Sequence, residues 1–127
     1  MTEAVDGITV TAIVTVGLGS PVAAGVGPVM PWRPSTINTV VLLDACLAPG
    51  AAVNAVVTAT EAKVGALVEA GVVTPDGAPA TGTATDAVVV AWTGRGAVLP
   101  YLGPASVGGW LVARAVRRAA ARGIGAA

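Results

Sequence analysis

The sequence is unusual first for the reactive side chains that it lacks. Its 127 residues include no histidine, no phenylalanine and one cysteine, Cys46. Without histidine, the chain cannot build a serine–histidine or cysteine–histidine catalytic pair, and it lacks a frequent zinc ligand. We therefore expect no zinc centre and assign no metal ligands, although the two carboxylates Asp86 and Glu61 are of the type that binds magnesium or calcium. A single cysteine cannot form an internal disulfide, which is typical of the reducing cytoplasm, where we expect this protein.

Charge is scarce as well. Charged residues make up 11% of the chain and the net charge is zero, whereas a usual share is about 25%. A neutral chain has no bulk attraction to nucleic acid or to anionic lipid, so we expect neither as a partner. A folded monomer of this size exposes roughly 6,000 Å², over which so few charges leave wide apolar patches. The composition therefore favours a homo-oligomer or a partner subunit.

Targeting and membrane signals are also missing from the pattern. The longest charge-free stretch, residues 7–32, is interrupted repeatedly by glycine and proline, so it does not predict a membrane helix. Glu3 and Asp6 stand where a signal peptide would carry basic residues. We expect no membrane partner.

What is present predicts an α/β fold in one domain, residues 1–127. Alternating and β-branched residues favour strands over residues 8–16, 36–47 and 85–92, the second of them central because it is almost continuously apolar. Residues 51–70 favour a helix closed by Gly71, and Pro104 begins a last helix that Gly123 ends. The order β-β-α-β-α predicts a sandwich in which helices cover a central mixed sheet. A long Gly/Pro loop, residues 17–34, joins the first two strands.

Three threonines alternate along the loop that enters the last strand. Thr81, Thr83 and Thr85 lie on one side if this loop is extended, and Asp86 follows them. Hydroxyls and a carboxylate at the mouth of a strand suit the binding of a polar group. Alternatively, Asp86 is a turn or cap residue that bonds nearby backbone amides.

The first predicted helix has a polar stripe and an apolar arc. At 100° per residue, Glu61 lies on the polar stripe, and Lys63 lies at the edge of the opposing arc. Periodicity alone makes Glu61 an ordinary surface charge. The polar stripe comprises Asn54, Thr58, Glu61, Gly65 and Glu69, and the apolar arc comprises Val53, Val56, Val57, Val64, Leu67 and Val68.

Two further residue types admit two interpretations each. Asn38, at the start of the central strand, is either an oxyanion donor or an asparagine that stabilises a turn. The tryptophans Trp32, Trp92 and Trp110 are either stacking platforms for a flat ligand or structural anchors.

Three segments, taken in order, resemble motifs of the adenosylcobinamide amidohydrolase (CbiZ) family. That family carries Gly-Thr-Ile-Asn, Thr-Ala-Thr-Glu-Ala-Lys and Thr-Gly-Thr-Gly-Thr-Asp runs. The middle run matches completely, while Ser35 and Ala84 each stand where the family has glycine. The matching segments are Ser35-Thr36-Ile37-Asn38, Thr58-Ala59-Thr60-Glu61-Ala62-Lys63 and Thr81-Gly82-Thr83-Ala84-Thr85-Asp86.

The resemblance implies hydrolysis of the amide that joins the aminopropanol arm to the corrin ring of adenosylcobinamide, releasing adenosylcobyric acid. It makes a corrinoid the expected ligand and names no cofactor. The nucleophile, water or one of the loop threonines, stays open. The resemblance implies catalytic roles for Glu61, the first choice for the working carboxylate, and for Asp86, Asn38 and Lys63, with substrate binding by Thr36, Thr58, Thr81, Thr83 and Thr85.

The resemblance also allows a second function. It runs from about Val10 to the end and lacks the N-terminal segment of longer relatives. Where the family often has a His-Thr pair and a glutamate in the last helix, Ala105, Ser106 and Trp110 stand here. These departures favour, as the alternative, a non-catalytic corrinoid-binding or interaction subunit derived from that family.

Overall fold

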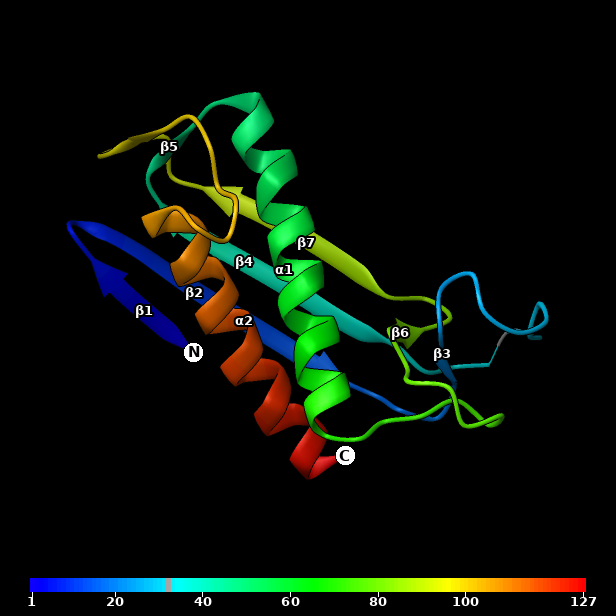
Figure 1. Cartoon of the computed structure of the whole chain (residues 1–127). Helices are drawn as coiled ribbons and strands as arrows, with labels where there is room; N and C mark the ends of the chain where they lie inside the picture. The colour runs from blue at the N-terminus through cyan, green and yellow to red at the C-terminus, as the bar shows by residue number, and fades with distance from the viewer. Residues whose placement is uncertain (32) are drawn as a thin grey trace.

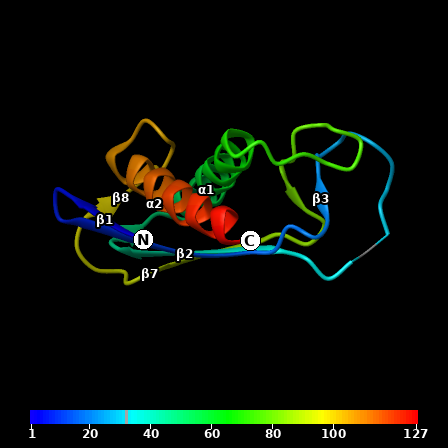
Figure 2. The ribbon, with the colours of Figure 1, turned by 90° about the horizontal axis from the view of Figure 1, so that it is seen from below.

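The computed structural model describes residues 1–31 and 33–127, so Trp32 lies outside the described residues. A four-stranded sheet carries two long helices on one of its faces (Figures 1 and 2). The elements are β1 (Thr2–Val5), β2 (Ile8–Val16), β3 (Pro21–Val22), β4 (Ile37–Asp44), β5 (Cys46–Leu47), α1 (Pro49–Glu69), β6 (Gly82–Thr83), β7 (Ala87–Trp92), β8 (Val98–Leu99) and α2 (Val107–Ala126).

The main sheet is mixed, as the sequence predicts. Its strand order is β1-β2-β4-β7, in which β2 pairs antiparallel with both neighbours and β4 pairs parallel with β7. β4 is central, as expected from its apolar run. The predicted strand over residues 36–47 is split, because β4 ends at Asp44 and Cys46–Leu47 pairs separately with β8.

The strand β1 is absent from the sequence-based prediction. It forms a hairpin with β2 across Asp6 and Gly7, both of which have positive φ, 52° and 77°. Asp-Gly is a frequent pair in two-residue hairpin turns, because these turns need positive φ at both central positions. The Asp-Gly pair could therefore have indicated this hairpin from the sequence, although β1 itself is too short to show periodicity.

The helix α1 packs on a different face from the predicted one. The buried side carries alanines together with Thr58, Lys63 and Leu67, whereas the expected apolar arc is largely exposed. Val53, Val57 and Val68 are 64%, 50% and 52% exposed. The small alanine side chains let α1 lie close to the sheet and to α2. By length and composition α1 is also long and apolar enough to cross a membrane, and 44% of its most apolar window is buried inside the domain.

The helix α2 begins and ends later than predicted. Ser106 caps it by accepting a hydrogen bond from the Gly109 backbone N–H at 3.1 Å, so Pro104 precedes the helix instead of starting it. Gly123 lies within α2, where an added Cβ would contact the Val16 side chain. The glycine therefore allows close packing of helix on strand and does not end the helix.

Candidate functional site

A buried ion pair connects α1 to the loop before β7. Lys63 Nζ donates to Asp86 Oδ2 at 2.5 Å, and the two side chains are only 7% and 15% exposed. The other oxygen, Asp86 Oδ1, accepts from Thr83 Oγ1 at 2.5 Å and from the Ile37 backbone N–H at 3.0 Å. Asp86 thus joins α1, the β6–β7 loop and the start of β4. We call Lys63, Thr83 and Asp86 the polar cluster.

Asp86 is ionised at neutral pH. Burial is the largest single effect and raises the pKa of its carboxyl, but the hydrogen bonds from Lys63, Thr83 and the Ile37 N–H act together in the other direction. The net pKa of Asp86 lies below the ordinary value. The Asp86 carboxylate therefore stays charged, accepts the hydrogen bonds that position Lys63 and Thr83, and is a weak base.

We expect acid to remove the stabilisation that Asp86 supplies. Because its folded-state pKa is lowered, this contribution is present above the unfolded-state pKa of about 3.9 and is lost as the pH falls through the folded value. The unfolding free energies of the wild-type protein and of Asp86→Asn should thus converge below about pH 4. Denaturant titrations from pH 7 to pH 2 measure this. Glu3, whose pKa is lowered chiefly by its hydrogen bond from Arg118, is common to both proteins and cancels. A difference that is independent of pH would contradict the expected ionisation.

The Lys63–Asp86 pair lies so close to the backbone at position 82 that a residue without a side chain, Gly82, is needed there. An added Cβ would lie 2.9 Å from Lys63 Nζ and closer still to Asp86 Oδ2. We expect Gly82→Ala to destabilise the fold by about 2 kcal/mol, since the ion pair must shift. The free energy of unfolding measures the effect. Gly50→Ala is the matched control, because a Cβ there meets nothing within 4 Å, and it should cost nothing. Equal stabilities of the two variants would refute the steric explanation.

The threonines predicted to bind substrate all make hydrogen bonds within the protein. Thr36 Oγ1 donates to the Thr85 carbonyl, and Thr85 Oγ1 donates to the Ser35 carbonyl, each at 2.8 Å. Thr81 Oγ1 accepts from the Ala24 N–H. The first two bonds hold the segment before β4 against the β6–β7 loop, and the third joins the long loop to the residue that precedes β6. Thr58 does not take part in these contacts. Its buried hydroxyl instead donates to the Leu102 carbonyl at 2.8 Å.

Two predicted catalytic residues are not brought to the polar cluster. Glu61 lies on the exposed side of α1, separated from Lys63 by about 200° around the helix. Asn38 is exposed on the sheet face turned away from the helices, and its side-chain amide lies 3.4 Å from Thr15 Oγ1. Within residues 1–31 and 33–127, no three acidic or cysteine side chains are grouped as a metal site.

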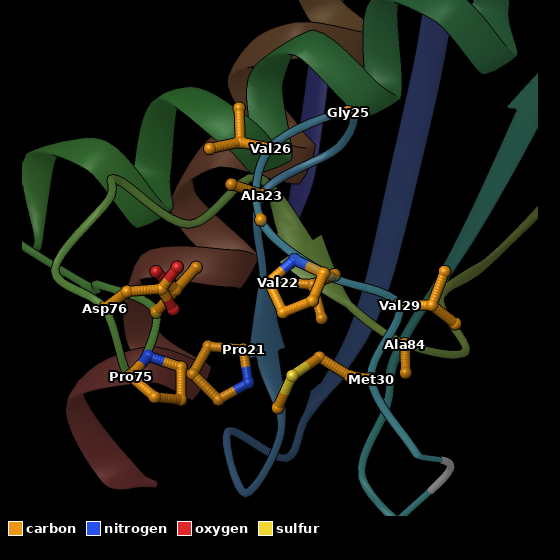
Figure 3. A pocket seen from close by; sticks show the side chains of 13 residues that line it. Pro21, Val22, Ala23, Gly25, Val26, Val29, Met30, Pro75, Asp76 and Ala84 are labelled. Atoms are coloured by element: carbon orange, nitrogen blue, oxygen red, sulfur yellow. The ribbon is translucent and has the colours of Figure 1, made fainter.

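A pocket that the sequence did not indicate lies beside the β6–β7 loop. Its volume is about 370 Å³, and Ala84, two residues before Asp86, forms part of its wall. Figure 3 shows Asp76 and Val29 on opposite sides of it. Most of its other lining residues are prolines, glycines and aliphatic residues from positions 21–30. The long Gly/Pro loop was therefore the one sequence feature that could have indicated this pocket. Ala84 therefore connects this largely aliphatic pocket, whose wall also includes Thr74 and Asp76, to the loop that carries Asp86, and no residue of the polar cluster lines the pocket itself.

A second, more open hollow lies by Thr85. It has a volume of about 490 Å³ and is lined by residues at the end of β2 and before β4, together with Thr85. The β6–β7 loop therefore contributes one residue to each hollow, Ala84 to the first and Thr85 to the second. A ligand in either hollow would lie against the segment that carries Asp86.

The family model described as adenosylcobinamide amidohydrolase matches residues 1–127, the whole chain, so the chain belongs to that family. This confirms the resemblance seen in the three motifs. Neither the curated proteins nor the solved structures contain a match to the chain.

Proposed function

Starting from membership of the adenosylcobinamide amidohydrolase family, we propose that this chain hydrolyses the aminopropanol amide of adenosylcobinamide to release adenosylcobyric acid. The observation that carries the proposal is the polar cluster. It joins the second and third family-like motifs through the Lys63–Asp86 pair and reaches the first through the Ile37 N–H. Segments separated in sequence thus meet at one place.

Amide hydrolysis needs hydrogen-bond donors for the oxyanion that develops on the carbonyl. Lys63 is the chain's one lysine, and one of its three ammonium protons is directed to Asp86. The other protons are suited to donate to the oxyanion or to the leaving amine. Asp86 holds the ammonium and the Thr83 hydroxyl in place, which reduces the reorganisation needed during reaction.

The adjoining pocket suits the less polar part of a large ligand. Its aliphatic and proline-rich wall would exclude water from the side of the β6–β7 loop. We place the corrinoid against this wall, with the scissile amide directed towards the loop. We further propose that the reaction takes place in the cytoplasm, in line with the single cysteine.

The burial of the polar cluster favours a second candidate function, a corrinoid-binding subunit without catalysis. Lys63 and Thr83 are each only 6% exposed, and the cluster's hydrogen bonds also serve to fasten the loop to α1. A binding subunit needs the loop and its pocket but no access to the ammonium group.

Incubation of the purified chain with adenosylcobinamide distinguishes the two functions. Separation of the products, with identification by mass, should yield adenosylcobyric acid. A change in the corrinoid absorption spectrum without product would instead support the binding subunit. Unchanged substrate with an unchanged spectrum would overturn both.

A further inference from the structure

The sheet face turned away from both helices is apolar at its centre. Ile13, Leu42 and Val89 are 53%, 41% and 53% exposed there. The register places Ile13, Val40 and Val89 opposite one another in one row across β2, β4 and β7. A neighbouring row contains Leu42 and Ala91. We call these five residues the outer apolar face. Figure 2 shows the helices together on the opposite side of the sheet.

Polar residues surround this centre, and charge is nearly absent. Among the described residues of the four strands, Asp44 is the one charged side chain that points to this side, and Thr93 Oγ1 donates to it at 2.8 Å. An apolar centre inside a polar border, with charges depleted, is the usual anatomy of a protein interface. The border consists of Thr2, Thr9, Thr11, Thr15, Asn38 and Asp44.

The outward side chains at the centre also differ from those of a sheet face that meets water. Where one face of an antiparallel sheet meets water, its outward positions are normally polar. Here the outward positions at the centre are aliphatic.

We propose that a second copy of this chain covers the outer apolar face, so that two sheets pack face to face about a two-fold axis. A nearly uncharged surface meets its own copy without electrostatic repulsion, and a two-fold contact needs only one self-complementary patch. Packed sheets lie about 10 Å apart with interdigitating side chains, and the branched residues of the central row fit that spacing. This inference is independent of the proposed reaction.

The area approaches what a dimer needs. The strands β1, β2, β4 and β7 contain 4, 9, 8 and 6 residues. At about 3.3 Å per residue and about 4.8 Å between strands, they present about 430 Å² of flat sheet per copy, polar border included. Two copies then cover about 860 Å² of flat sheet, and the side chains that stand out from both sheets bring the buried accessible area towards the roughly 1,000 Å² at which specific interfaces begin.

Sedimentation of the full chain at micromolar concentration tests the proposal. The wild-type protein should sediment at twice the monomer mass of 12.2 kDa. Val89→Lys and Ile13→Lys place like charges against each other across the two-fold axis. Each should raise the dimer dissociation constant at least about tenfold. Circular dichroism verifies that the variants are folded, which is expected because both side chains are half exposed.

Val57→Lys is the matched control. It introduces the same charge at a valine that is 50% exposed on α1, and Figure 2 shows that α1 lies on the opposite side of the sheet from the outer apolar face. It should leave the dimer intact. A monomeric wild-type protein, including one that binds a different protein through this face, would overturn the proposal. So would a dimer that Val57→Lys dissociates and that Val89→Lys and Ile13→Lys do not affect.

Discussion

Replacing Lys63 by methionine should destabilise the fold by about 3 kcal/mol at pH 7. Methionine fills much of the same space, so the loss is mainly electrostatic. Asp86 would keep its hydrogen bonds from Thr83 and the Ile37 N–H, but its carboxylate would remain buried without a cation. Breaking a buried pair on one side is costly for this reason. The free energy of unfolding in urea measures the change.

Two matched variants separate the charge effect from loss of packing. In the double variant Lys63→Met/Asp86→Asn no charge is left unpaired, so it should recover most of the lost stability. Arg117→Met breaks an exposed pair with Glu69, whose side chains are 49% and 69% exposed, and should cost less than about 1 kcal/mol. If the double variant were no more stable than Lys63→Met, an unpaired carboxylate would not be the cause.

The fold was largely predictable because its long elements carry clear periodicity. The alternation over residues 8–16 corresponds to β2, and the apolar run after Thr36 corresponds to central β4. The packed side of α1 was not predictable from hydrophobicity, because its valines are more apolar than its alanines. Which side of α1 is buried depends on how the helix packs against the rest of the fold, and this tertiary context overrides the local pattern.

The site was predictable only in part. The motifs singled out Lys63, Thr83 and Asp86, but their contact depends on how α1 and the β6–β7 loop meet. Glu61 stands in the same motif as Lys63, yet the helical repeat directs it to the exposed side. The resemblance predicts a catalytic role for Glu61, whereas the polar cluster predicts that Glu61 is dispensable, so the activity of Glu61→Gln decides between these two predictions. The pocket by Ala84 arises from a loop without periodicity, whose shape the sequence pattern does not specify.

The second large effect concerns turnover. Asp86→Asn should lower the rate of adenosylcobyric acid formation by at least about 100-fold. The amide no longer neutralises the Lys63 ammonium, and it accepts through only one oxygen. Thr83→Val removes the neighbouring hydroxyl at nearly constant shape, and it should lower the rate as well. It thereby tests the same cluster without removing the buried carboxylate.

The most direct test compares Asp86→Asn with Glu61→Gln in the same adenosylcobinamide assay, with products identified by mass and folding verified by circular dichroism. The polar cluster predicts that product nearly disappears with Asp86→Asn and forms at close to the wild-type rate with Glu61→Gln, because Glu61 lies on the exposed side of α1. Loss of product with Glu61→Gln, together with full activity of Asp86→Asn and Thr83→Val, would contradict the assignment of the active site to this cluster.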